Sequence, residues 1–498
     1  MRYSSFFYLS CLLVAIDRPW QIHARGFFGR LLDMVTGEGG GDHPVGGNSN
    51  SYSSSNSNST GSIKIGTRRT ERADGGGGFP TARLSNGVSF PLVGLGAGNL
   101  PPEAVQGIVA HGLAADKNVR LIDTARVSQN EFLVARGIVE GAERLASAPD
   151  KGADPSEVHV VTKVWYTHLG YERTLLSARS SLEALAEARD HPGVDLRVHL
   201  LLHWPRCYDE IPWMDCAGEE EGLPPDTRAA GPAPHLDPAG AWKGSWRALE
   251  ELLADPSNPI ASIGVSNFHR RDLEELEAFA AVRPQLLETS AWSLLYDPLL
   301  IEFCHKWGIH VVAHNLMEGV LYRASEAPFA SHHLLSVAND LSLTIDAGKA
   351  TTDPGTGVSA AQVVLAWLVQ HSISVIPMTT DLSHLGENSA VALSRIPAMD
   401  DRQVRVVAES VEALISGDDL TEDAFVTVTF HARSKDVFLY WHDPEFGGEI
   451  EVARIDKGTS FEESSHPGHE FKIYDVEGGG MEFFRVAGNY GEHKHIEL

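Results

Sequence analysis

Apolar residues in the middle of the chain form short, nearly continuous runs that alternate with longer stretches of helical spacing. Strands buried on both faces have this continuous apolar character, and their alternation with helices is typical of a parallel sheet. Eight repeats of the pattern predict a (β/α)₈ TIM barrel, an α/β fold, with a doubly wound sheet as the rival architecture. The predicted strands are FPLVGLGAG, VRLIDTA, VHVVTKVW, RVHLLLHWP, IASIGVSNF, PQLLETSAW, GIHVVAHN and SVIPMTT.

Helical spacing of apolar positions fills the gaps between these runs. The rival architecture needs a G-x-G-x-x-G loop between a strand and a helix, and GLGAGN at Gly94–Asn99 has the wrong spacing. An amphipathic stretch at Asp400–Ile415 is expected to close the barrel domain, which we place at residues 80–417. The main predicted helices are TLLSARSSLEALAEA, WKGSWRALEELLA, RRDLEELEAFA, PLLIEFCHKW and SAAQVVLAWLVQ.

A different pattern begins near residue 423. Short alternating or aromatic runs, separated by turn sequences such as DPEFGG, DKG and EGGG, predict a small all-β sandwich at residues 423–498. The runs are AFVTVTFHA, VFLYWHD, EIEVARI, HEFKIYDV and MEFFRVAG.

The first 79 residues show neither pattern. An arginine followed by the apolar run Phe6–Ile16 resembles a secretory signal peptide at residues 1–24, although a fortuitous apolar terminus is the alternative. The run is too short to span a bilayer, so we expect no membrane span in the mature chain. Residues 25–79 are rich in Gly, Ser and Asn and predict a disordered linker. The expected location is the secretory pathway or the extracellular space, with the cytoplasm as the alternative.

Charge and cysteine content narrow the picture further. The formal net charge of -27 argues against a nucleic-acid partner, because such binding depends on Lys and Arg neutralising phosphates. Two insertions, Arg206–Gly240 and Leu321–Gly357, follow predicted strands and are expected to shape the carboxyl-terminal mouth of the barrel. Cys207 and Cys216 lie in the first insertion, and the sequence leaves open whether they pair.

Polar residues stand at the carboxyl ends of four predicted strands: Asp123, Lys163, His203, and the pair Ser266 and Asn267. In barrel enzymes the chemistry occurs at these strand ends. A carboxylate, an ammonium and an imidazole in one pocket can shift one another's pKa and move protons. The sequence therefore predicts an active site at the mouth.

The ordered blocks LSNGVSFPLVGLG, IDTA, TKVW, LLHWP and IGVSNF resemble the signature blocks of the aldo-keto reductases over about residues 81–417. The resemblance implies an oxidoreductase that uses NADP or NAD to reduce an aldehyde or ketone. It puts Asp123, Lys163 and His203 in the family's aspartate, lysine and histidine positions. The proton-donating tyrosine is expected five residues after the aspartate, where this chain has Ser128.

Ser128 is a chemical departure from that pattern. A phenol titrates near 10, and a neighbouring ammonium lowers its pKa toward the working pH, whereas a serine hydroxyl is a far weaker acid. Proton donation contributes roughly 10²- to 10⁴-fold to such reactions. The sequence leaves two functions open: a carbonyl reductase, or an inactive barrel that acts as a cofactor sensor or scaffold.

The resemblance also assigns cofactor contacts. Ser266 and Asn267 match the pair that binds the nicotinamide carboxamide, while Glu288 replaces a glutamine and His314 replaces a stacking aromatic ring. Near the eighth strand two cations expected on the 2′-phosphate of NADP are missing, so NADP binding is expected to be weakened. The positions there are Met378 and His384 in place of the cations, Thr379 beside them, and Glu387 and Asn388, which match the pair that recognises adenine.

In the last domain, LYWHD and DKGTSFEESSHPGHEFKIYD resemble the β domain of the von Hippel-Lindau tumour suppressor over about residues 423–492. The resemblance implies a pocket for a hydroxyproline-containing peptide, with Trp441, Ser465 and His469 in three pocket positions. Val452 and Phe471 replace a tyrosine and a tryptophan of that pocket. An accessory sandwich without a ligand is the alternative.

Histidines near the carboxyl terminus raise the question of a metal site. His493 and His495 share one strand face, but no third ligand follows at a spacing typical of a metal centre. We therefore predict no metal.

Overall fold

The computed structural model describes residues 80–498 except 148–155, 210, 291–297, 316, 318–326, 348–356, 417–418, 421–425, 443–448, 466–468, 477–479 and 488–492. The predicted signal peptide and linker lie outside the described residues. Among the helices that are described, none combines the length and apolar character needed to cross a membrane.

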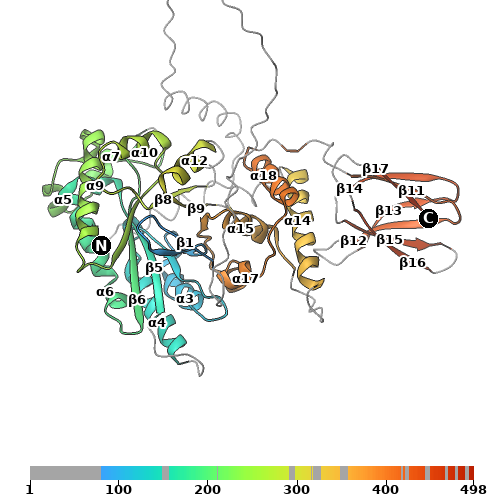
Figure 1. Cartoon of the computed structure of the whole chain (residues 1–498), viewed down its shortest axis with the longest axis horizontal. Coiled ribbons are helices and arrows are strands. Elements are labelled where there is room, and N and C mark those ends of the chain that lie inside the picture. Colours follow the sequence, from blue (N-terminus) through green and yellow to red (C-terminus); the bar gives the residue numbers. More distant parts are fainter. Residues whose placement is uncertain are drawn as a thin grey trace, which may run out of the picture. The chain divides into compact units, whose positions relative to one another are not determined.

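Eight parallel strands form the barrel domain (Figure 1). The first and last strands meet through backbone hydrogen bonds from Gly94 N to Val375 O (2.8 Å) and from Val375 N to Leu92 O (2.9 Å). The closed sheet confirms the predicted (β/α)₈ fold and excludes the doubly wound alternative. In order around the barrel, the strands are β3 (Leu95–Gly96), β4 (Leu121–Asp123), β5 (Ser156–Val164), β6 (Val194–Leu202), β7 (Ile260–Ser266), β8 (Leu286–Ser290), β9 (His310–His314) and β10 (Ser374–Val375).

Helices cover the outside of the strands (Figure 1), each burying an apolar face. At α15, a capping box fixes the first turn: Ser359 Oγ accepts from Gln362 N (3.3 Å), and Gln362 Oε1 accepts from Ser359 N (3.0 Å). The described helices of this layer are α3 (Pro102–Gly112), α4 (Glu131–Ala146), α5 (Tyr171–Ala184), α6 (Ala186–Arg189), α9 (Pro238–Ala254), α10 (Arg270–Glu277), α12 (Pro298–Trp307), α14 (Pro328–Ala347), α15 (Ala360–Gln370), α16 (Leu382–Glu387), α17 (Ala390–Ser394) and α18 (Asp401–Ser416). The first insertion adds two short helices, α7 (Cys216–Glu221) and α8 (Pro225–Ala229).

Two local expectations differ from the structure. The run FPLVGLGAG is divided between β2 (Ser89–Pro91), which pairs with β1 (Thr81–Arg83) in an antiparallel hairpin, and β3. The segment expected to be a mouth insertion after the seventh strand contains α14, whose apolar residues are buried in the main core of the barrel. Burial of this face makes α14 part of the outer helical layer.

The barrel interior has a polar layer at the amino-terminal ends of the strands, which we call the floor cluster. His159 Nδ1 lies 2.9 Å from His199 Nε2, and His199 Nδ1 lies 2.6 Å from Ser262 Oγ. His310 Nε2 lies 2.8 Å from Ser374 Oγ, which donates to the carbonyl of Pro91 (2.9 Å). The ring of Phe90 from β2 makes edge contacts with all three imidazoles. The members of the floor cluster are His159, His199, Ser262, His310 and Ser374.

The carboxyl-terminal domain is the all-β module that the sequence predicted. Its described residues form a three-stranded and a four-stranded sheet around one core, to which Val428, Phe430, Leu439 and Phe471 contribute. The strand SFEESS was not among the predicted runs because it is largely polar, whereas HKHIE forms the strand that was assumed for His493 and His495. The order in the three-stranded sheet is β14 (Ser460–Ser465), β11 (Val426–His431) and β17 (His493–Glu497). The order in the four-stranded sheet is β13 (Glu449–Ile455), β12 (Val437–His442), β15 (Glu470–Asp475) and β16 (Met481–Arg485).

Candidate active site

The carboxyl ends of β4, β5 and β8 bring together three buried charged residues, which we call the mouth cluster: Asp123, Lys163 and Glu288. Lys163 Nζ donates to Asp123 Oδ1 and to the carbonyl of Thr124 (3.1 Å), and it forms an ion pair with Glu288 Oε1 at 3.0 Å. The ion pair between Asp123 and Lys163 joins residues 40 positions apart. Of the carboxylate of Glu288, which the resemblance assigns to the cofactor, Oε1 pairs with the ammonium of Lys163.

Burial and neighbouring charge shift the ionisation of this cluster. Burial and the negative charge of Glu288 raise the pKa of Asp123 to about 7, against the opposing effect of Lys163. For Lys163, burial lowers the pKa, but the charges of Asp123 and Glu288 outweigh it and the net pKa is raised. The ammonium therefore stays charged, and one carboxyl proton is held near neutral pH.

Two imidazoles lie near the mouth cluster. His203 follows β6, and its pKa is held well below the ordinary range by burial and by the positive charge of Lys163. Burial and Lys163 likewise lower the pKa of His314, at the end of β9, to about 4. Both rings are neutral at physiological pH. The indole of Trp165, after β5, packs edge-on against His203 with centroids 4.9 Å apart.

Ser266 and Asn267 occupy the expected place at the end of β7. Asn267 adopts a left-handed backbone conformation (φ 57°), and its Nδ2 donates to His203 O (3.0 Å) and to Ser266 Oγ (3.2 Å). Nearby, His203 Nδ1 and Glu288 Oε2 are buried and have no hydrogen-bond partner among the described residues. Unsatisfied buried polar atoms are costly unless a ligand completes them, so this part of the mouth fits the polar groups of a bound ligand.

Ser128 lies in the 3₁₀ turn Arg126–Ser128 that follows β4. It is half-buried, and its hydroxyl is close to Gly98 after β3, where an added Cβ would approach Ser128 Oγ to 3.2 Å. The serine thus stands on the mouth side of the barrel. The other two residues of this turn, Arg126 and Val127, carry no phenol group.

The residues after β10 that were assigned to the adenosine half do not form a cation site. Met378 and His384 are exposed, and Thr379 Oγ1 accepts from Asp381 N (3.0 Å). Asp381 was missed by the sequence analysis, although an Asp before LSHL is a typical helix N-cap. Its Oδ1 accepts from Ser383 N (2.7 Å) and His384 N (3.2 Å), so a carboxylate occupies the start of α16. At the end of that helix are Glu387, which is exposed, and Asn388, which is half-buried.

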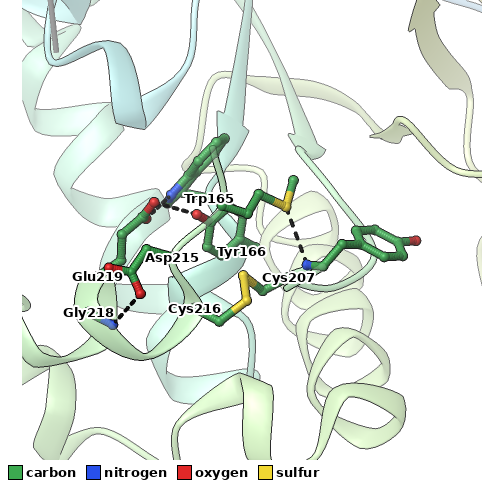
Figure 2. The surroundings of a disulfide bond; sticks show 9 residues. Trp165, Tyr166, Cys207, Asp215, Cys216, Gly218 and Glu219 are labelled. Atoms are coloured by element: carbon green, nitrogen blue, oxygen red, sulfur yellow. Dashed lines mark hydrogen bonds between the residues drawn. A yellow bond between two sulfur atoms is a disulfide. The ribbon is translucent and has the colours of Figure 1, made fainter. Parts of the chain in front are cut away.

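The first insertion lies at the mouth, as predicted, and a disulfide joins Cys207 to Cys216 at its start (Figure 2). The carboxylate of Glu219, in α7 (Cys216–Glu221), accepts from Trp165 Nε1 (2.8 Å) and from the hydroxyl of Tyr166. The exposed indole of Trp213, between the two cysteines, stacks on Trp165 at a centroid distance of 6.3 Å. The insertion therefore adds an aromatic wall next to His203.

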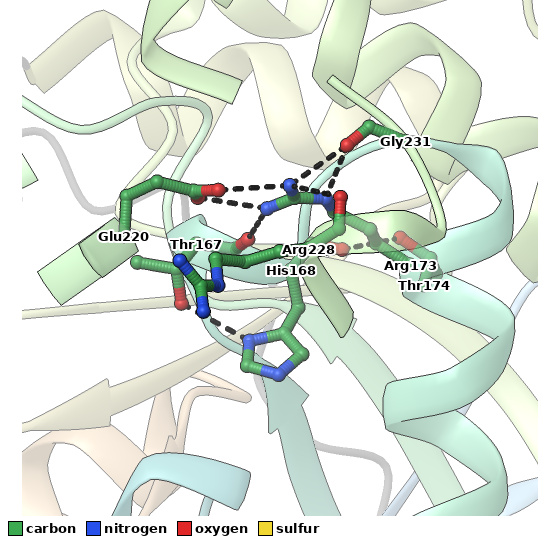
Figure 3. A network of polar contacts seen from close by, with 7 residues as sticks. All are labelled: Thr167, His168, Arg173, Thr174, Glu220, Arg228 and Gly231. Carbon is green, nitrogen blue, oxygen red and sulfur yellow. Dashed lines mark hydrogen bonds and ion pairs between the residues drawn. The ribbon is translucent and has the colours of Figure 1, made fainter. Parts of the chain in front are cut away.

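A buried arginine attaches the rest of this insertion to the barrel (Figure 3). Arg173 of α5 is 1% exposed and makes two hydrogen bonds to the carboxylate of Glu220, at 2.8 and 2.9 Å. It also donates to the carbonyls of Thr167 (3.0 Å) and Gly231 (2.8 Å). Because the planar guanidinium bonds to several groups at once, it holds the insertion in one position at the mouth of the barrel.

In the carboxyl-terminal module the three pocket residues predicted from sequence lie together. Ser465 Oγ is 2.9 Å from His469 Nδ1, and the rings of Trp441 and His469 are 5.6 Å apart. Trp441 Nε1 is a buried donor that has no partner in the described part of the module. Burial lowers the pKa of His469 to about 4, so its ring is neutral.

One group of described residues has ligand atoms close enough for a metal ion: Cys207, Asp209 and Cys216. Both sulfurs are used in the disulfide, which removes two of the three ligands.

Comparison with known proteins identifies the barrel. The model of the aldo/keto reductase family matches residues 92–409. The chain is 30% identical over 316 residues to the uncharacterized oxidoreductase YtbE of Bacillus subtilis, covering 62% of this chain and 86% of that protein. It is 29% identical over 317 residues to a glyoxal reductase of the same organism, with the same coverage of each chain.

A solved structure, the aldose reductase from Schistosoma japonicum, is similar with a TM-score of 0.46 and 20% identity, covering 68% of this chain and 96% of that chain. The match of the family model ends at residue 409, within the barrel domain.

Proposed function

We propose that this chain, which belongs to the aldo/keto reductase family, reduces the carbonyl group of an aldehyde or ketone with a nicotinamide cofactor, preferably NADH. One observation carries the proposal: Lys163 Nζ is bound to Asp123 at adjacent strand ends, beside the buried Ser266 and the half-buried His203. This grouping combines a fixed positive charge with polar groups for a ligand in a water-poor site.

When bound, the nicotinamide would supply the hydride. The chain's own part is to hold the reactants and the proton. Ser266 and Asn267, with the unpartnered Nδ1 of His203, would bind the carboxamide. Lys163 favours negative charge on the carbonyl oxygen, and neutral His203 can orient that oxygen through a ring N–H. The indoles of Trp165 and Trp213 would exclude water from one side.

The preference for NADH is supported by the residues after β10. A 2′-phosphate needs cations, whereas this chain has Met378 and His384 in place of the lysine and arginine, and Asp381 presents a carboxylate at the same helix start. Each charge-assisted bond to phosphate contributes about 1.5–3 kcal/mol, so the missing pair would cost NADPH at least tenfold in affinity.

Fluorescence titration of nicotinamide tests both statements. We expect NADH to bind at least tenfold more tightly than NADPH, and the triple variant Met378→Lys, Asp381→Asn, His384→Arg to reverse the order. Asn keeps the helix cap, so the variant changes charge and leaves α16 intact. Failure of both cofactors to bind would favour the alternative of an inactive scaffold.

Turnover is tested separately with Ser128→Tyr. A phenol at this position restores the family's proton donor, and we expect kcat/KM for an aldehyde to rise by up to roughly 10²-fold. Binding of NADH without turnover in either protein would make the barrel a cofactor sensor.

A second candidate function concerns the carboxyl-terminal module. The unpartnered Nε1 of Trp441, beside Ser465 and His469, favours a small polar ligand such as the hydroxyl of hydroxyproline. Calorimetric titration with a matched peptide pair, with and without proline hydroxylation, tests this. Ser465→Ala should weaken binding of the hydroxylated peptide, and Ser460→Ala on the same strand is the control. Equal affinity for the two peptides would leave an accessory domain.

Passage through the secretory pathway is proposed as well. The Cys207–Cys216 disulfide suits an oxidising compartment, and the apolar amino terminus resembles a signal peptide. Expression of the full chain in eukaryotic cells, followed by amino-terminal sequencing of the mature product, tests this; a product that begins at Met1 would contradict it.

A further inference from the structure

The mouth cluster contains more negative than positive charge. Lys163 provides one ammonium, while Asp123 and Glu288 provide two carboxylates, and all three side chains are at most 11% exposed. Two ionised carboxylates beside one ammonium would bury a net negative charge, which is strongly unfavourable. A single proton shared by the two carboxyl groups removes this cost.

The hydrogen bonds of Lys163 indicate which group can reach a ligand. Three oxygen atoms surround the ammonium: it donates to Asp123 and to the carbonyl of Thr124, and Glu288 Oε1 lies 3.0 Å away as an ion-pair partner. The lysine therefore cannot donate to a substrate without giving up one of these contacts. Glu288 Oε2, in contrast, is buried and has no partner among the described residues.

We propose that Glu288 is the proton donor of this active site and takes the place of the missing tyrosine: with Asp123 it shares one proton above Lys163, and it delivers that proton from Oε2 to the carbonyl oxygen of the substrate. The role rests on the proposed carbonyl reduction. In the step, the O–H bond at Glu288 breaks as the O–H bond of the product alcohol forms, and the hydride supplied to the carbonyl carbon balances the charge. Both carboxylates are then ionised, and a proton from solvent restores the cluster.

The surroundings support a proton at this place. The titratable groups that face the cluster are His203 and His314, and both are neutral because burial and the charge of Lys163 lower their pKa values. They add no positive charge that would replace the shared proton. The pKa of Asp123, raised to about 7, agrees with a proton held by the pair near neutral pH.

Infrared titration of the ligand-free, full-length protein tests the shared proton directly. With carbon-13-labelled aspartate and glutamate, we expect an isotope-shifted band of a protonated carboxyl group near pH 7. Glu288→Gln should abolish it, because Asp123 then pairs with Lys163 alone. Glu131→Gln is the matched control: Glu131 is also buried, but its Oε2 lies 3.6 Å from Arg126. No band in the wild type, or a band that survives Glu288→Gln, would overturn the proposal.

Kinetics with NADH and 4-nitrobenzaldehyde test the donor role. We expect Glu288→Gln to lower kcat/KM at least 10²-fold and to remove the decline at high pH, while the NADH dissociation constant changes less than threefold. Glu131→Gln should keep the wild-type pH profile. An unchanged kcat/KM in Glu288→Gln would refute the donor role. Loss of NADH binding in the wild type would instead refute the proposed function, and the infrared result would still decide whether the proton is shared.

Discussion

The two ends of the barrel interior hold polar clusters that are built from the same strands but differ in their bonding. On β5, His159 belongs to the floor cluster and Lys163 to the mouth cluster, and on β7 Ser262 lies at the floor and Ser266 at the mouth. These pairs are four residues apart, so both members point into the barrel. At the floor each imidazole has a hydrogen-bond partner, whereas at the mouth Glu288 Oε2 and His203 Nδ1 have none.

This difference separates structural from functional polarity. A buried polar group that is satisfied by the protein stabilises one arrangement, and it offers nothing to a ligand. A buried polar group without a partner costs free energy until something binds it. The floor cluster therefore has the features of a fixed scaffold, and the mouth cluster those of a site that is completed by a ligand.

The largest effect is expected from Lys163→Met in the mouth cluster. The variant leaves two buried carboxylates without a counter-ion, and we expect the free energy of unfolding at pH 8 to fall by about 3–5 kcal/mol. Urea denaturation measures it. If the free energy of unfolding falls by less than about 1 kcal/mol, the cluster is hydrated and contributes no more to stability than an exposed ion pair.

As the pH falls, the floor cluster should lose stability and the mouth cluster should gain it. Burial lowers the pKa values of His159, His199 and His310, that of His310 to about 4, so the unfolded chain binds protons first and stability falls from about pH 6.5 downward. His310 alone should cost about 2 kcal/mol at pH 5. Asp123, with a raised pKa, takes up its proton first in the folded chain and gains stability as the pH falls through about 7.

We therefore expect the urea midpoint of the wild type to fall between pH 7 and pH 5, because three imidazoles of the floor cluster with lowered pKa values oppose the raised pKa of Asp123 in the mouth cluster. In Glu288→Gln the opposing gain from Asp123 is lost, and the fall should be steeper. If the urea midpoint of Glu288→Gln falls less steeply with pH than that of the wild type, the mouth cluster does not gain stability in acid.

The smallest effects come from the matched serines of β7. Ser262→Ala removes the partner of His199 Nδ1 and should lower the free energy of unfolding by about 1–3 kcal/mol, without changing NADH affinity. Ser266→Ala should cost less than about 1 kcal/mol of stability but weaken NADH roughly tenfold. Urea denaturation and fluorescence titration of both variants give the comparison. Equal effects on NADH affinity would remove the distinction between the two ends.

Much of the site was predictable because strand ends are recognisable in sequence. Asp123, Lys163, His203 and Ser266 each follow an apolar run, and a closed parallel barrel brings such positions to one end. The bonding of Glu288 was not predictable in this way. Its neighbours in sequence indicate only a strand, and its contact with Lys163 depends on how the side chains of β5 and β8 meet across the barrel.

The sequence by itself determined the eight strands, their helices, the all-β module and the absence of the tyrosine, since periodicity and residue identity are local properties. Only the tertiary structure decided the pairing of Cys207 with Cys216, the carboxylate of Asp381 at the start of α16, and the shared environment of Asp123 and Glu288. Each of these depends on distances between side chains that are remote along the chain or on the geometry of a particular turn. Hydrophobic spacing fixes which residues face inward, but packing fixes which of them touch.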